Sequence, residues 1–276
     1  MMTRVQEHLD AIRSSGKKAL IPFLCGGFPS VGEMRDSILA TDRTLQECGG
    51  PGVIEIGIPF SDPIADGAVI AQAMHRALSA GVTPAEIFQA VYKIRRDVDS
   101  ALVAMVSVSI VLKRGPRRFI EEAREAGFDG FIFPDIAAED CDELLNLATG
   151  AGLSTSLLVA PTTESKRAEE IARRSSGFVY VITRMGITGE GLPTGGGTAL
   201  AERVQALRGV TRLPIAGGFG ISDAAGVRES VWQGGADAAI VGSAIVRRMT
   251  TASERGESAA AAAARAIAEL AAGLRS

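Results

Sequence analysis

Short apolar segments rich in Val, Ile, Leu and Phe alternate along the chain with longer segments in which apolar residues recur every three or four positions. The first pattern is typical of strands buried on both faces, and the second of amphipathic helices. The alternation predicts eight strands, at residues 19–24, 53–58, 102–108, 130–133, 154–159, 178–182, 213–216 and 238–241. It also predicts a leading helix at residues 5–14, then helices at residues 31–48, 69–80, 84–97, 116–126, 139–149, 165–174, 198–207 and 222–232, and a closing helical region.

Strands that alternate with helices form parallel βαβ units. Eight such units in 276 residues predict an α/β protein, a single-domain (β/α)₈ TIM barrel over residues 1–276 with a leading N-terminal helix. A doubly wound open sheet is the alternative. Because no G-x-G-x-x-G motif follows the first predicted strand, a dinucleotide-binding version of that sheet is disfavoured.

Composition excludes several classes of function. The formal net charge is -3 and basic residues form no dense run, so we expect no binding to nucleic acid or to an anionic membrane. Cys25, Cys48 and Cys141 are odd in number and lack the spacing of metal ligands, which indicates reduced thiols. His8 and His75 are the only two histidines, so neither a zinc site nor a histidine-based triad is expected.

The chain shows no targeting or membrane segment. Charged residues occur early in the N-terminal region, which lacks the apolar core of a secretion signal. The longest apolar run, at residues 101–112, is shorter than the roughly 20 residues that span a bilayer. We therefore expect a cytoplasmic protein.

One carboxylate stands inside a predicted buried strand. Glu55 lies between Ile54 and Ile56, and removing a carboxylate from water costs several kcal/mol unless it is paired, hydrogen-bonded or protonated. A catalytic acid or base would justify that cost, although a structural carboxylate held by a buried donor is the alternative.

A second carboxylate, Asp66, follows this strand in a loop stiffened by Pro59 and Pro63. An aspartate before a glycine often caps a turn or helix, but together with Glu55 it indicates two carboxylates facing one pocket.

Two glycine-rich turns follow the last two predicted strands, at residues 216–222 and 241–245. Backbone N–H groups at such turns, backed by a helix N-terminus, bind anions, and phosphate usually binds there in a barrel. The alternative is that the glycines only allow tight connections. The order of the two turns favours a small phosphorylated substrate.

A third glycine-rich loop occupies residues 184–197 after the sixth predicted strand. It is longer than a connection requires, so we interpret it as a lid that closes over substrate, with disorder without function as the alternative.

These motifs carry a resemblance to a known family. Residues 54–67, Ile-Glu-Ile-Gly-Ile-Pro-Phe-Ser-Asp-Pro-Ile-Ala-Asp-Gly, resemble the signature of the tryptophan synthase α subunit family, whose members are (β/α)₈ enzymes. Further matches follow in family order at residues 21–23, 130–135, 160–163, 180–189, 218–222 and 242–246. The resemblance covers the chain from about residue 20 to residue 246.

The resemblance implies cleavage of indole-3-glycerol phosphate to indole and glyceraldehyde 3-phosphate in tryptophan biosynthesis. This retro-aldol reaction needs no metal, Schiff base or other cofactor. By resemblance, Glu55 is the acid/base that protonates indole C3 and takes the proton of the glycerol hydroxyl, and Asp66 accepts the indole N–H. The positions matched to substrate binding are Phe23, Tyr180, Thr188, Gly189, Gly218, Phe219, Gly220, Gly242 and Ser243, and Asp135 matches an aspartate of the fourth strand.

The chain departs from the family pattern at two places. The family commonly has Gly-Asp-Pro where this chain has Gly27-Phe28-Pro29, and a Tyr and an Asn where it has Ser107 and Ser109. The second segment faces the PLP-dependent β subunit in the family, so the departures weigh against that partner, whereas the retained loop residues Asp62 and Pro63 favour it. A stand-alone indole-releasing lyase, a catalytically silent barrel that regulates a β subunit, and a barrel acting on another phosphorylated substrate are the alternatives.

Overall fold

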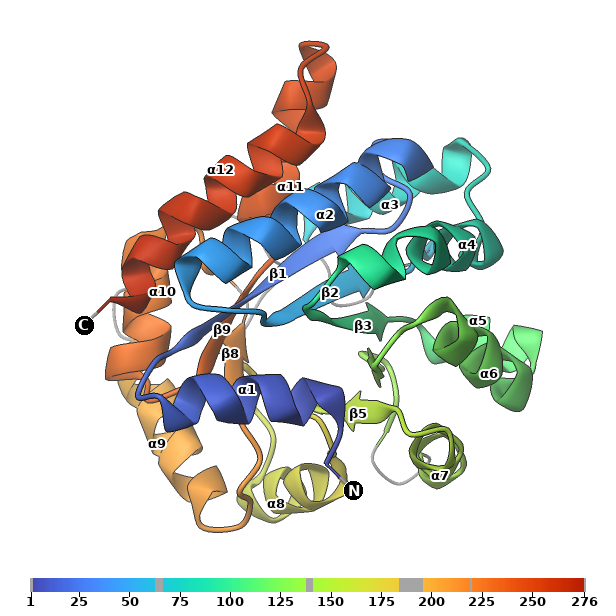
Figure 1. Cartoon of the computed structure of the whole chain (residues 1–276). Coiled ribbons are helices and arrows are strands. Elements are labelled where there is room, and N and C mark those ends of the chain that lie inside the picture. Colours follow the sequence, from blue (N-terminus) through green and yellow to red (C-terminus); the bar gives the residue numbers. More distant parts are fainter. Residues whose placement is uncertain (1, 63–66, 138–140, 184–195, 219, 276) are drawn as a thin grey trace.

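The computed structural model describes residues 2–62, 67–137, 141–183, 196–218 and 220–275, and its strands are all parallel (Figure 1). Hydrogen bonds join the strands in the order β5-β4-β3-β2-β1-β9-β8-β7-β6. In chain order they are β1 (Ala19–Cys25), β2 (Val53–Gly57), β3 (Ala101–Met105), β4 (Gly130–Ile132), β5 (Ser154–Ser156), β6 (Leu158–Val159), β7 (Val179–Ile182), β8 (Ile215–Gly218) and β9 (Ala238–Val241).

The sheet curves into a nearly closed barrel because one predicted strand joins its two ends. The predicted strand at residues 154–159 is divided at Leu157 into β5 and β6, which raises the number of strands from the predicted eight to nine. β5 pairs with β4, whereas β6 pairs with β7, and the backbone N–H of Tyr180 donates to the carbonyl of Leu157 at 3.1 Å. The predicted TIM-barrel fold is confirmed.

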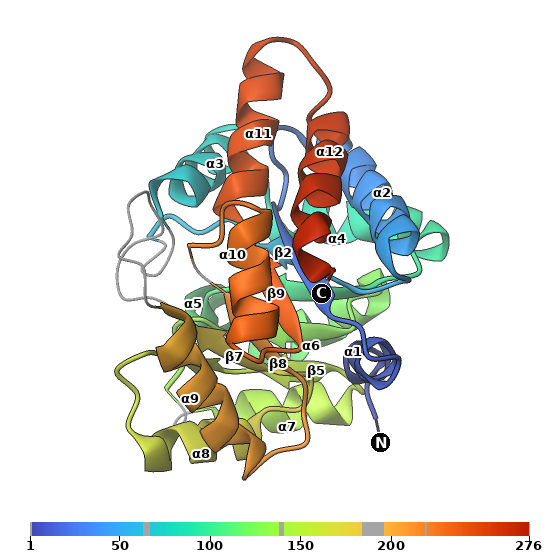
Figure 2. The same cartoon turned by 90° about the vertical axis from the view of Figure 1, so that its left-hand side faces the viewer.

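Helices surround the barrel, as Figures 1 and 2 show. The helices are α1 (Arg4–Ser14), α2 (Val31–Cys48), α3 (Ala68–Ser79), α4 (Pro84–Ile94), α5 (Val108–Arg114), α6 (Pro116–Ala126), α7 (Asp142–Gly150), α8 (Ser165–Arg174), α9 (Gly196–Arg208), α10 (Ala224–Arg228), α11 (Ser243–Glu254) and α12 (Ala259–Ala271). Short 3₁₀ segments follow α4 (Arg95–Asp97) and α12 (Ala272–Leu274), and a π-helical turn follows α10 (Glu229–Gln233). None of the helices in these described ranges has the length and apolar character required to cross a bilayer.

The leading helix α1 packs at the N-terminal end of the barrel. The side chain of Thr3 accepts a hydrogen bond from the backbone N–H of Gln6 and caps the helix. Val5 and Leu9 are buried and join an inner core cluster with residues of the strands, including Ala19 and Val53. This packing leaves the opposite, C-terminal end of the strands for the predicted site.

The predicted strand at residues 102–108 was too long. β3 ends at Met105, and α5 begins at Val108 because polar groups cap its first turn. The Ser107 hydroxyl accepts from the N–H of Ser109 at 3.2 Å, and an Asp135 carboxylate oxygen accepts from the N–H of Val108 at 3.0 Å. The apolar residues Val108, Ile110 and Val111 therefore belong to a short helix rather than to a strand.

The closing helical region consists of two helices, α11 and α12. The alanine-rich α12 lies along α2 and α11 (Figure 1). Its small buried side chains, including Ala259, Ala263 and Ala266, allow this close packing, as predicted for an outer helix.

Candidate active site

Glu55 lies at the centre of the candidate site because β2 points its side chain into the barrel. It is aligned with Phe23 of β1 and with Val103 of β3. Side chains two residues apart on a strand share a face, and Val53 belongs to the inner core cluster together with Val103. Glu55 is only 1% exposed, so its carboxylate lies inside the barrel rather than on the surface.

Two strand-end glycines make room for the ring of Phe23. A Cβ atom at position 57 would lie 2.5 Å from both Cε2 and Cζ of Phe23, and one at position 242 would lie 3.3 Å from its Cβ and Cδ1. The ring is therefore held between the ends of β2 and β9. Two side chains of α3 lie beside it: Ile70 would be 3.1 Å from a Cβ at position 242, and Met74 3.3 Å from a Cβ at position 57. Phe23 therefore presents an apolar ring at this end of the barrel, and its predicted contact with substrate stays a prediction.

Tyr180 also projects into the barrel, from β7. It belongs to the same inner cluster as Val53 and Val103 and is 6% exposed. A Cβ atom at Gly218 would lie 2.7 Å from both Cε2 and the hydroxyl of Tyr180, so the ring fills the space over the end of β8. Next to it, the N–H and the hydroxyl of Thr183 both donate to the carbonyl of Gly218 at 2.9 Å, which fixes the end of β8 against β7.

The N-terminus of α11 faces the same end of the barrel, because α11 follows β9 directly at Gly242. Its first turn carries no acidic residue, and none of the side chains that the structure describes forms a capping hydrogen bond with it. The hydroxyl oxygen of Ser243 is buried and has no hydrogen-bond partner within the described parts of the chain. An uncapped helix N-terminus with such a hydroxyl has the donors that an anion requires.

The neighbouring turn, after β8, leads to a helix that a side chain does cap. Gly220 is exposed and has φ +78, a conformation that favours glycine. The carboxylate of Asp223 accepts from the N–H of Gly226 at 2.8 Å and thereby caps the five-residue helix α10. Gly218, Gly220, Gly242 and Ser243 are thus placed at the ends of two adjacent strands, β8 and β9.

Several predicted positions lie outside the described residues. They are Asp66, Thr188, Gly189 and Phe219, together with the main part of the predicted lid at residues 184–195. The pairing of Glu55 with Asp66 therefore stays a prediction. Within the described ranges, His, Cys, Asp and Glu side chains form no group of three that could hold a metal ion.

Sequence reasoning did not identify a polar link between the ends of β3 and β4. The Ser107 hydroxyl donates to Asp135 at 2.6 Å, while the other Asp135 oxygen accepts from the N–H of Val108. The capping of α5 by Ser107 could be inferred locally, because a serine hydroxyl often accepts from the N–H two residues later. Its hydrogen bond to Asp135 could not, because Asp135 lies 28 positions further along the chain. Gly57, Met74 and Thr183 were also missed, because only the fold brings them to the site.

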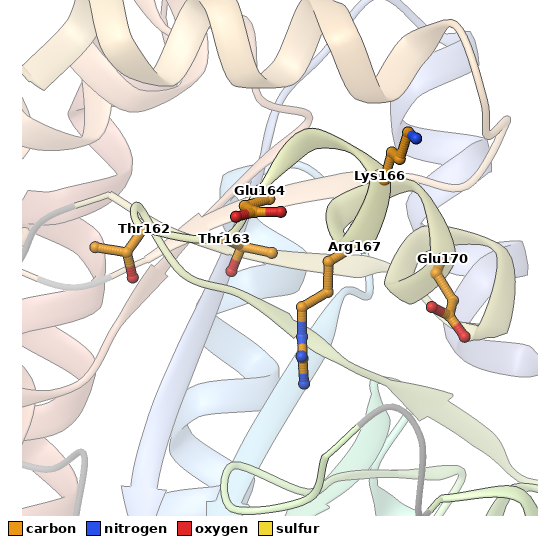
Figure 3. A pocket seen from close by; sticks show the side chains of 6 residues that line it. All are labelled: Thr162, Thr163, Glu164, Lys166, Arg167 and Glu170. Atoms are coloured by element: carbon orange, nitrogen blue, oxygen red, sulfur yellow. The ribbon is translucent and has the colours of Figure 1, made fainter.

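The open pocket at the start of α8 is a different feature. Figure 3 shows its six lining side chains, Thr162, Thr163, Glu164, Lys166, Arg167 and Glu170, around a cavity of about 610 Å³. Lys166 and Arg167 point in different directions, so the polar groups do not converge on one ligand position. The pocket lacks the convergent groups of a specific binding site.

Comparison with known proteins gives a consistent result. The family model for the tryptophan synthase alpha chain matches residues 9–275. The tryptophan synthase alpha chain of Prochlorococcus marinus is 38% identical over 252 residues, which cover 90% of this chain and 87% of the relative. That of Halorhodospira halophila is 40% identical over 250 residues, covering 89% and 87% of the two chains.

Solved structures agree in fold over nearly the whole chain. A chain in the structure of Mycobacterium tuberculosis tryptophan synthase superposes with a TM-score of 0.86 at 30% identity and covers 100% of both chains. The tryptophan synthase A-subunit of Pyrococcus furiosus superposes with a TM-score of 0.78 at 33% identity, covering 92% of this chain and 98% of that one. The chain therefore belongs to the tryptophan synthase alpha chain family, whose members are lyases of tryptophan biosynthesis.

Proposed function

We propose that this chain cleaves indole-3-glycerol phosphate to indole and glyceraldehyde 3-phosphate, with Glu55 as the acid/base. The observation that carries the assignment is the position of Glu55, 1% exposed and directed into the barrel beside Phe23. The assignment of substrate rests on membership of the alpha chain family.

In the proposed reaction the carboxyl group of Glu55 protonates indole C3, while the carboxylate of Asp66 accepts a hydrogen bond from the indole N–H. The resulting indoleninium takes up the electron pair of the bond between C3 and the glycerol chain. As that bond breaks, Glu55 takes the proton of the adjacent glycerol hydroxyl, which becomes the aldehyde of glyceraldehyde 3-phosphate. The proton lost to C3 is thus recovered, and atoms and charge balance without a metal or organic cofactor.

Phosphate binding is proposed at the ends of β8 and β9. The buried hydroxyl of Ser243 and the uncapped N-terminus of α11 favour an anion there. Gly218, Phe219, Gly220 and Gly242 would contribute backbone groups, and Thr188 and Gly189 of the lid would close over the phosphate. Phe23 and Tyr180 would contact the aromatic part of the substrate.

The proposed partner is a tryptophan synthase β subunit. Family membership favours it, as does the exposed position of Asp62 in the loop after β2. Ser107 and Ser109 replace the expected Tyr and Asn, so a stand-alone lyase is the competing proposal. We further propose that residues 1–276 form a single domain and that the protein acts in the cytoplasm.

The first test is indole release from indole-3-glycerol phosphate by the purified chain, alone and then with a β subunit and serine. Release that rises on adding the β subunit supports an alpha chain that docks, and co-elution in gel filtration supports the complex. Rapid release without any effect of the partner supports a stand-alone lyase. No release in either condition contradicts the proposed substrate.

The Glu55→Gln variant tests the role of the carboxylate. We expect indole release to fall roughly 10²- to 10⁴-fold, the range of a general acid/base, with circular dichroism unchanged. The matched control is Asp42→Asn, which alters a carboxylate that is 1% exposed and hydrogen-bonded to the N–H groups of Asp99 and Ser100. That variant should lose stability but, below its unfolding temperature, retain activity. Normal activity of Glu55→Gln would instead favour a silent, regulatory barrel.

A further inference from the structure

A second cavity lies at the N-terminal end of the barrel, opposite the candidate active site. Its volume is about 450 Å³, within the roughly 300–1,000 Å³ range of small-molecule sites. It is lined by residues of the turn between α1 and β1, the C-terminal end of α2, the π-helical turn after α10, and the last residues of the described chain. The lining includes Ile12, Lys17, Lys18, Leu20, Leu45, Glu47, Trp232, Ala271, Leu274 and Arg275.

The lining of this cavity combines apolar and polar groups, and its charged side chains are mainly positive. Leu20, Leu45 and Ala271 provide buried apolar surface. Lys17, Lys18 and Arg275 contribute three positive charges, against the single acidic side chain of Glu47. A positive cavity is unexpected in a chain whose net charge is -3, and it favours an anionic ligand with an apolar body.

Lys18 is held in place by the fold. Its Nζ donates to the carbonyl of Ala236 at 2.7 Å and lies 5.4 Å from the centroid of the Trp232 ring. Burial lowers the pKa of Lys18, and the nearby carboxylate of Asp237 opposes that shift. The ammonium group therefore positions the indole ring, leaving the other two cations of the cavity for a ligand.

Lys17 and Arg275 form no side-chain hydrogen bond or ion pair with another residue in the portion of the chain that the structure describes. Both side chains are exposed. Two exposed cations that line one cavity beside buried apolar side chains supply the charge for a carboxylate whose apolar part is buried.

Trp232 enters the cavity from an unusual piece of backbone. The turn Glu229–Gln233 is π-helical, and the N–H of Gly234 donates to the carbonyl of Glu229, five positions earlier, at 2.7 Å. Single π turns are rare and are frequently found at functional sites. The indole Nε1 donates to the carbonyl of Leu274 at 3.3 Å, and the residue Trp232 is 38% exposed. A partly exposed indole that lines the same cavity as two further cations suits a planar ligand.

We propose that this cavity is an accessory binding site for a small carboxylate that carries a planar apolar group. The apolar group would pack on Trp232 and Leu45, and the carboxylate would bind Lys17 and Arg275. The site is independent of the proposed lyase reaction, because none of its lining residues contributes to the barrel end that holds Glu55.

Trp232 is the only tryptophan of the chain, so its fluorescence reports directly on this cavity. We would titrate the full-length protein with benzoate while exciting the indole selectively. The expected result is a saturable change in emission, together with a rise in the unfolding temperature. Benzamide, which has the same shape without the charge, should bind at least about tenfold more weakly.

The double variant Lys17→Ala/Arg275→Ala should also weaken benzoate binding by about tenfold or more, while indole release is unchanged. The matched control is Lys93→Ala/Arg96→Ala, which removes two exposed cations elsewhere and should bind benzoate normally. Equal binding of benzamide, normal binding by the first double variant, or no saturable change in emission would each overturn the proposal. Inorganic phosphate, added as a competitor, should leave the benzoate signal intact if the two sites are separate.

Discussion

The ring of Phe23 occupies the space into which a side chain at Gly57 would project. The two residues stand at the ends of neighbouring strands, and a Cβ at position 57 would lie 2.5 Å from two ring carbons, closer than real Cβ contacts occur. Gly57 is therefore required by the packing of Phe23. Glu55, two residues earlier on the same strand face, depends on the same local geometry.

Replacing Gly57 by Ala should displace the Phe23 ring. We expect a loss of about 1–3 kcal/mol in the free energy of unfolding, the usual cost of overpacking, and a rise in KM for the substrate. Urea denaturation and steady-state indole release would measure the two effects. In the control Gly32→Ala, the new methyl in the first turn of α2 would meet only the hydroxyl of Ser30 at 3.9 Å, so stability should not fall. A Gly57→Ala variant as stable as this control would contradict the packing argument.

Replacing Gly218 by Ala should disturb Tyr180, since the new methyl would lie 2.7 Å from its hydroxyl and Cε2. The main effect of Gly218→Ala should be on the rate of indole release rather than on the free energy of unfolding, because the strained contact lies on the side of Tyr180 that is proposed to face substrate. Adding Tyr180→Phe removes the hydroxyl contact and should restore part of the lost stability. Thermal unfolding of the single and double variants checks this coupling, with Gly226→Ala as control, where the nearest atom would be 3.5 Å away. If the effects of Gly218→Ala and Tyr180→Phe on thermal unfolding were simply additive, a direct contact between the two positions would be contradicted.

Replacing Ser107 by Ala removes both the hydrogen bond to Asp135 and the cap on α5. Loss of such a cap typically costs about 1 kcal/mol, and Ser107→Thr should recover most of it. Ser109 is exposed, so Ser109→Ala should change the free energy of unfolding by less than about 0.5 kcal/mol. If α5 contacts a β subunit, the Ser107→Ala variant should also show a smaller stimulation by that subunit. Equal stability of both alanine variants would show that the link to Asp135 contributes nothing.

Arg95 and Asp129 form an ion pair at the N-terminal ends of β3 and β4, with 3.0 Å between nitrogen and oxygen, and each side chain is about 15% exposed or less. Burial raises the pKa of Asp129, and Arg95 only partly opposes this shift. Burial likewise lowers the pKa of Arg95. Removing Arg95 alone, as Arg95→Met, would leave a buried carboxylate and should cost about 2 kcal/mol, below the 3–5 kcal/mol of a fully buried pair.

The sign of the pH effect follows from the raised pKa of Asp129. A carboxyl group whose pKa is higher in the folded than in the unfolded state favours folding when protonated, so its stabilising contribution is lost as pH rises through the folded pKa. The Arg95→Met variant should therefore regain stability relative to the parent as pH is lowered. The added change Asp129→Asn, which still accepts from the N–H of Leu102, should abolish that pH dependence. Urea unfolding at acidic and neutral pH would measure the free energy of unfolding of each protein. If the parent and the Arg95→Met variant showed the same dependence of that free energy on pH, the prediction would be wrong.

The order of strands and helices followed from the sequence, because hydrophobic periodicity is local. α2, α6, α8 and β9 have the predicted bounds. Where prediction failed, a longer-range contact decided the outcome: the third strand ends early because Asp135, from the next strand's loop, caps a helix at Val108. The division of the fifth strand at Leu157 likewise depends on pairing with two different neighbours.

The same distinction applies to the site. Glu55 could be selected from sequence alone, since a carboxylate within an apolar strand demands an explanation wherever that strand lies. The glycine turns could be selected because glycine permits backbone conformations and close approaches that other residues do not. Gly57 beneath Phe23, and the cavity that gathers Lys17, Trp232 and Arg275, depended on the tertiary structure. The members of each group lie far apart in the chain, and only the tertiary fold brings them to one place.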